Sequence, residues 1–88
     1  MTMTCWKTLL TKAMQCHNET FSDIVANTMS DKEMTKKFDD NFGRVNGCPF
    51  TVWTSTRVYF PVQYDGAEKV SSISRNPDGK ATDHVGGG

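Results

Sequence analysis

The sequence predicts an α+β domain, with two or three short N-terminal helices packed on one face of a C-terminal three-stranded antiparallel meander. The apolar residues of the first half recur at helical spacing, whereas residues 50–74 are rich in β-branched and aromatic residues. At 88 residues, the chain has room for one core only. We therefore expect a single domain over residues 1–80, followed by a flexible glycine-rich tail over residues 81–88.

Spacing and capping motifs define the expected helices. A first helix over residues 4–17, with Thr4 as its N-cap, would place on one face Trp6, Leu9, Leu10, Ala13 and His17. Thr20 and Asp23 resemble a capping box and predict a second, short helix. Ser30, with Glu33 three residues later, is a full capping box and predicts a third helix, which we expect to end near residues 39–40.

The second half of the chain predicts strands. They are expected over residues 50–54, 57–64 and 68–74. Ser55-Thr56 makes a short polar turn between the first two, and Asp65-Gly66, a dipeptide typical of hairpin turns, separates the last two. Pro61 cannot donate a ladder hydrogen bond, so we expect either a bulge there or an unpaired side of the middle strand.

Strand alternation assigns side chains to the two faces of this sheet. The face expected to cover the helices carries Val58, Phe60, Val62 and Tyr64, together with Phe50 and Val52. The opposite face would then carry Trp53, Tyr59 and Pro61. If the helices cover one face only, this second set lies at the surface.

These exposed residues form the predicted partner-binding site. The site consists of Trp53, Arg57, Tyr59, Pro61 and Arg75. Exposed aromatic side chains beside arginine are typical of the residues that dominate protein–protein binding. One alternative is that the tail or a helix covers the aromatic side chains as a second small core. Another is a homodimer joined through the spare sheet face.

Charge and hydropathy exclude several classes of protein. Ten basic residues balance ten acidic ones, so a nucleic acid is not the expected partner. The alternative, a small nucleic-acid-binding or regulatory protein, would use Lys32, Lys36 and Lys37 of the third helix against phosphates. No apolar run reaches the roughly 18 residues of a membrane span, and no signal peptide is recognised at the N-terminus, so we expect a cytoplasmic protein.

The cysteines and histidines predict no metal site and no cofactor. Three cysteines without a C-x-x-C pair indicate reduced thiols rather than a disulfide framework. The zinc-type ligands, whose spacing matches no structural zinc motif, are Cys5, Cys16, His17, Cys48 and His84. Cys48 with His84 and Asp83 could form a thiol enzyme, but this trio has no distinguishing motif, so we expect no catalytic activity.

Several segments resemble a family of short proteins carried by phages and mobile elements. They are residues 49–54, 57–66, 75–77 and 84–87, and more loosely residues 21–26 and 38–40. The resemblance brings no catalytic residues with it. It implies a stoichiometric inhibitor that binds a host protein, the class that includes anti-CRISPR proteins, and hence a host or Cas protein as the partner.

Overall fold

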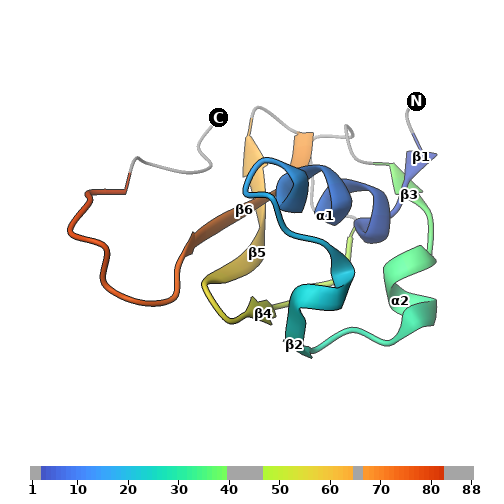
Figure 1. The fold of residues 1–88 in the computed structure, drawn as a ribbon. Coiled ribbons are helices and arrows are strands. Elements are labelled where there is room, and N and C mark those ends of the chain that lie inside the picture. Colours follow the sequence, from blue (N-terminus) through green and yellow to red (C-terminus); the bar gives the residue numbers. More distant parts are fainter. Residues whose placement is uncertain (1–2, 40–46, 65–66, 83–88) are drawn as a thin grey trace.

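The computed structural model describes residues 3–39, 47–64 and 67–82. Along the chain, its elements are β1 (Met3–Thr4), α1 (Trp6–Gln15), the 3-10 helix η1 (Phe21–Asp23), β2 (Ile24–Asn27), α2 (Asp31–Thr35), β3 (Phe38–Asp39), β4 (Val52–Thr54), β5 (Arg57–Tyr64) and β6 (Ala67–Ser74). Figure 1 shows α1 lying across the sheet that contains β5 and β6, with α2 to one side. The predicted Asp65-Gly66 turn and the part of the predicted tail beyond residue 82 lie outside the described residues.

The main sheet has four antiparallel strands in the order β2-β4-β5-β6, so the predicted three-stranded meander is wrong. The strands β4, β5 and β6 correspond to the three that the sequence predicts, and β2 is the additional one. A second, two-stranded sheet pairs β1 with β3. The α+β class is retained, with two α-helices among the described residues instead of up to three.

The fourth strand replaces the predicted second helix. The Asp23 carboxylate accepts the Thr20 N–H at 2.8 Å, as in a capping box, but only one 3-10 turn follows. The chain then becomes extended at Ile24 and Val25, two β-branched residues that suit a strand. Pairing with β4, through a register shift between Ile24 and Ala26, therefore outweighs the helical spacing that predicted a helix here.

The helix α1 buries Trp6 and Leu10 as predicted, but both α-helices are shorter than predicted. In α1 the buried residues are Trp6, Leu10 and Met14, and the N-cap is Cys5 rather than Thr4. The capping box of α2 forms as predicted, because Ser30 Oγ accepts the Glu33 N–H at 3.2 Å and Glu33 Oε1 accepts the Ser30 N–H at 3.0 Å. The helix ends at Thr35, since the chain is already extended in β3 by Phe38.

The prediction of which sheet face meets the helices is wrong for β5. Tyr59 is fully buried, and Val58, Phe60 and Val62, predicted to be core residues, are only partly buried. Val52, correctly predicted to face inward, pairs directly with Tyr59, and paired residues point to the same face. Both alternating sets of residues in β5 contain apolar side chains, so alternation alone could not show which set faces the helices.

Among the described residues, Pro61 lies where β5 has a neighbouring strand on one side only. The register with β6 runs without a shift through the pair Pro61–Val70. On the other side, β4 pairs with β5 only opposite Val58 and Tyr59, short of the proline. Of the two predicted alternatives, the structure therefore shows the unpaired side rather than a bulge.

The core lies between α1 and the inner face of the sheet. Trp6 is its centre, with ring centroids 4.8 Å from Phe38 and 4.9 Å from Phe50. The other buried apolar side chains are Leu10, Met14, Met29, Met34, Val52 and Tyr59. This core uses one face of the sheet, and among the described residues Trp53, Val58 and Ile73 of the opposite face do not belong to it.

Candidate functional site

The first candidate site is the sheet face turned away from α1, here called the outer face. It consists of Trp53, Val58, Phe60, Val62 and Ile73. Trp53 pairs with Val58, and Val58 pairs with Ile73, which places these three side chains in one row across the sheet. Phe60 and Val62 continue the same face along β5, since side chains two residues apart share a face.

The outer face lies outside the core, with Ile73 exposed and Trp53, Val58, Phe60 and Val62 partly buried. None of its five residues belongs to the buried core or to the partly buried apolar residues that pack against that core. Ile73 is 42 % exposed, and on the neighbouring strand β2 Val25 is 62 % exposed. A contiguous apolar surface of this kind, on a sheet whose other face holds the core, is typical of an interaction surface.

Trp53 is the only residue of the predicted site that lies on the outer face. Tyr59, also predicted to be exposed, is buried on the opposite face, where its hydroxyl donates to Glu19 Oε1 at 2.5 Å. Pro61 lies two residues further along β5 and shares the face of Tyr59. The predicted combination of Trp53, Tyr59 and Pro61 into one surface is therefore wrong.

The Tyr59–Glu19 pair is a structural element. Glu19 Oε2 also accepts the Thr56 hydroxyl at 3.0 Å, so both carboxylate oxygens are bonded. Burial alone would raise the pKa of Glu19, but the hydrogen bonds from Tyr59, Thr54 and Thr56 outweigh it, and that pKa lies below its ordinary value. Burial and the bond to Glu19 raise the pKa of Tyr59. The pair ties the segment after α1 to the middle of the sheet.

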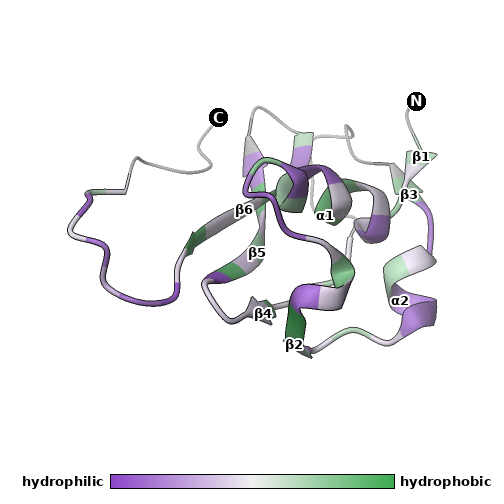
Figure 2. Ribbon diagram, in the orientation of Figure 1, coloured by the Kyte–Doolittle hydropathy of each residue, from purple (hydrophilic) through white to green (hydrophobic). Residues whose placement is uncertain are grey.

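The structure brings the two predicted arginines, Arg57 and Arg75, together in a second site. After β6, residues 75–82 project beyond the sheet (Figure 1). A cavity of about 760 Å³ opens beside this segment. We call it the basic groove and define it by His17, Arg57, Ser72, Arg75 and Lys80. Figure 2 shows that the segment following β6 is mostly hydrophilic.

Hydrogen bonds hold the groove's side chains in place. Arg57 Nε donates to Ser72 Oγ at 2.8 Å, and the same oxygen lies 3.3 Å from His17 Nε2. Arg75 Nη1 donates to the carbonyl oxygen of Thr54 at 2.9 Å. Burial and the nearby charge of Arg57 lower the pKa of His17, which favours the neutral imidazole.

Sequence reasoning did not place His17, Ser72 or Lys80 at this site. His17 was assigned to the apolar face of the first helix, whereas α1 ends at Gln15 and His17 lies in the turn after it. Ser72 and Lys80 carry no motif, and they reach the groove only because β6 pairs with β5 and the chain continues past it. No signal in the sequence could have found these two.

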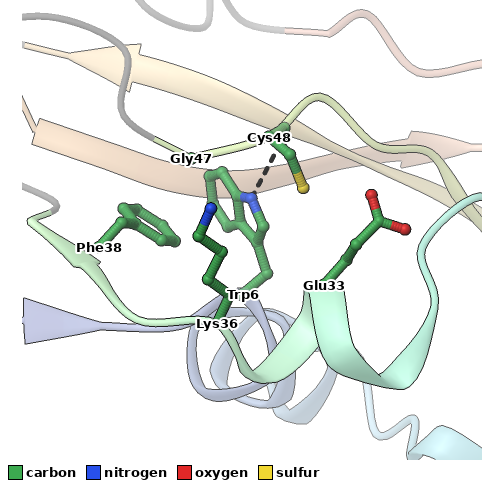
Figure 3. A pocket seen from close by; sticks show the side chains of 6 residues that line it. All are labelled: Trp6, Glu33, Lys36, Phe38, Gly47 and Cys48. Atoms are coloured by element: carbon green, nitrogen blue, oxygen red, sulfur yellow. Dashed lines mark hydrogen bonds between the residues drawn. The ribbon is translucent and has the colours of Figure 1, made fainter.

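A second, smaller cavity of about 210 Å³ lies beside Trp6, between α2 and the chain around Cys48 (Figure 3). Trp6 Nε1 donates to the Cys48 carbonyl oxygen at 2.9 Å. The indole passes so close to Gly47 that a Cβ there would lie 2.5 Å from Trp6 Cζ2. We read this cavity as part of the core packing. Asp83 and His84, the predicted catalytic partners of Cys48, lie outside the described residues.

Comparison with known proteins gave no match. A scan against protein-family models, a search of curated proteins and a search of solved structures each found none. Within residues 3–39, 47–64 and 67–82, no three His, Cys, Asp or Glu side chains are grouped so as to hold a metal ion. In the same residues, no helix is long and apolar enough to cross a membrane. The outer face and the basic groove are therefore the two candidate functional sites.

The lysines proposed for phosphate binding do not lie on one helical face. Lys32 lies in α2, but the helix has only five residues, Lys36 is its C-cap and Lys37 follows it. All three side chains are exposed. Because a five-residue helix cannot align them, the structure offers no support for the nucleic-acid alternative at this position.

Proposed function

We propose that this protein is a non-catalytic inhibitor that docks its outer face onto another protein. The observation that carries the proposal is the row of Trp53, Val58 and Ile73, which lies outside the core of the described chain. Protein interfaces have an apolar centre that is rich in aromatic residues and is surrounded by a polar rim. The outer face supplies such a centre, with Trp53 as its anchor.

The resemblance to short phage and mobile-element proteins supports a choice of target. It favours a host protein in the cytoplasm, and among host proteins a Cas effector. Inhibition would be stoichiometric, because the protein acts by occupying a surface and not by turnover. Arg57 and Arg75, at the neighbouring groove, would contact the charged rim of the same target.

The experiment titrates the protein into purified Cas effector complexes and measures cleavage of target DNA. Inhibition that saturates at one copy per effector supports the proposal. The test variant combines Trp53→Ala with Ile73→Asp, which removes the anchor and places a charge on the outer face. The control is Met3→Asp, which changes another exposed apolar residue, on β1. We expect the test variant to lose inhibition by about 100-fold or more and the control to keep it.

Two outcomes would contradict this function. Effectors that stay fully active in excess protein would remove Cas proteins as the target. Light-scattering chromatography that shows a dimer, dissociated by the Trp53→Ala and Ile73→Asp changes, would make the outer face a contact between two copies of this chain.

A further inference from the structure

The basic groove carries positive charge that the described chain does not neutralise. Of the charged side chains that line it within the described residues, Arg57, Arg75 and Lys80 are cationic and only Asp78 is anionic. Arg57 bonds to a serine hydroxyl and Arg75 to a backbone carbonyl, and neither forms an ion pair with a described carboxylate. The Asp78 carboxylate accepts a hydrogen bond from the backbone N–H of Lys80 at 2.9 Å. The remaining guanidinium N–H groups are donors suited to carboxylates or phosphates.

The lining of the groove favours a peptide over a nucleotide. Its walls are the extended chain of Ser72–Ser74 in β6 and the segment 75–82, which contains no helix. No Phe, Tyr or Trp of the described chain lines it, so these residues offer no aromatic platform on which a base could stack. An extended peptide beside β6 would lie along the end strand of the described sheet, and the addition of a strand to a sheet edge is a common mode of peptide recognition.

The groove meets the outer face at β6, although Arg57 and Ser72 themselves lie on the opposite face, which is the face of Tyr59. Ile73 belongs to the row of Trp53 and Val58 and also lines the groove. A protein that covers the outer face and continues around β6, the end strand of the described sheet, would therefore bring a neighbouring segment of its own chain to Arg57, Arg75 and Lys80. Since these charges are positive, the segment that complements them is acidic.

We propose that the basic groove binds an extended acidic segment of the protein that the outer face contacts. This inference rests on the proposed function for the identity of the partner, but the groove's preference for acidic peptide can be measured alone. Carboxylate side chains of the segment would accept from the free guanidinium N–H groups of Arg57 and Arg75 and pair with Lys80. The peptide backbone would run alongside β6.

The test measures binding of a fluorescent oligo-glutamate peptide by anisotropy. Oligo-glutamine, inorganic phosphate and a single-stranded oligonucleotide are the comparison ligands. The groove variant combines Arg75→Gln with Lys80→Gln, two exposed residues, and the matched control removes the same charge elsewhere through Lys12→Gln with Lys32→Gln. We expect the groove variant to weaken oligo-glutamate binding by about tenfold or more and the control by less than about twofold.

Equal weakening by the two variants would overturn the inference, because it would show attraction to overall charge only. Tighter binding of phosphate or the oligonucleotide than of oligo-glutamate would also overturn it, in favour of a phosphate ligand. The Trp53→Ala with Ile73→Asp variant separates the two proposals. If it abolishes effector inhibition while the groove variant binds oligo-glutamate like the wild type, only this inference fails. If no effector is inhibited but the groove still selects oligo-glutamate, only the proposed function fails.

Discussion

The substitution Tyr59→Phe tests the position of Tyr59 with the loss of a single oxygen atom. The ring is fully buried and its hydroxyl donates to Glu19 Oε1 at 2.5 Å. A hydrogen bond to a charged group contributes about 1.5–3 kcal/mol to stability. Glu19 is partly exposed and keeps its bond from Thr56, so we expect a loss near the lower end, about 1.5 kcal/mol.

Urea and thermal unfolding measure this loss. For a domain of this size, about 1.5 kcal/mol corresponds to a melting temperature lower by about 6–12 °C. The pKa of Glu19 is held below its ordinary value partly by Tyr59, so the difference between wild type and variant should be full at neutral pH and should shrink as pH falls below about 4.5. A double-mutant cycle with Glu19→Gln should show coupling of about 1 kcal/mol between the two residues.

Thr11→Val is the control, because it removes an exposed hydroxyl that bonds only the Lys7 carbonyl oxygen on α1. We expect it to change stability by less than about 0.5 kcal/mol. If Tyr59→Phe is equally mild and shows no dependence on pH, Tyr59 is not bonded to Glu19. The inward orientation of β5 argued above would then be wrong.

Three further predictions concern the core, a helix cap and the response to pH. Gly47→Ala should lower the free energy of unfolding, measured in urea, by about 1–3 kcal/mol, because the new Cβ would lie 2.5 Å from the buried Trp6 ring. Gly79→Ala places its Cβ where nothing lies within 4 Å, but the φ of +74° is unfavourable for alanine, so the expected loss is only about 1 kcal/mol. Ser30→Ala removes the acceptor of the Glu33 N–H and should cost about 1 kcal/mol, whereas Ser30→Gly should cost only a few tenths, and equal losses would count against the cap. Burial and Arg57 lower the pKa of His17 in the folded state, so the unfolded chain binds the proton more tightly and stability should fall as pH drops below 6.5; His17→Gln should remove this fall, and an unchanged profile would contradict it.

Some of the fold could be predicted from the sequence because local signals and tertiary packing agree. The burial of Trp6 and Leu10, the capping box at Ser30 and the whole span of β5 follow from helical spacing, side-chain chemistry and β-propensity. Each of these signals lies within a few neighbouring residues. The structure changes the ends of the helices but retains their apolar faces.

The parts that could not be predicted depend on contacts distant in sequence. Ile24 and Val25 lie after a real capping motif, and only pairing with β4 makes them a strand. The orientation of β5 depends on its pairing with Val52 and on the bond from Tyr59 to Glu19, 40 residues away in sequence. The site prediction failed for the same reason. Neighbouring residues of a strand point to opposite faces, so an error of one position in the orientation of β5 placed Tyr59 on the outer face, where the structure has Val58 and Phe60.

The matched pair Val52→Thr and Val58→Thr tests most directly whether the sheet has one packed and one free face. The two valines lie on adjacent strands, and each substitution replaces a methyl group by a hydroxyl. Val52 is fully buried on the inner face, so Val52→Thr should lower the free energy of unfolding by about 1–3 kcal/mol. Val58 lies on the outer face, and Val58→Thr should cost less than about 0.5 kcal/mol. Equal costs, measured by urea unfolding, would show that the outer face is packed within the protein and is not available to a partner.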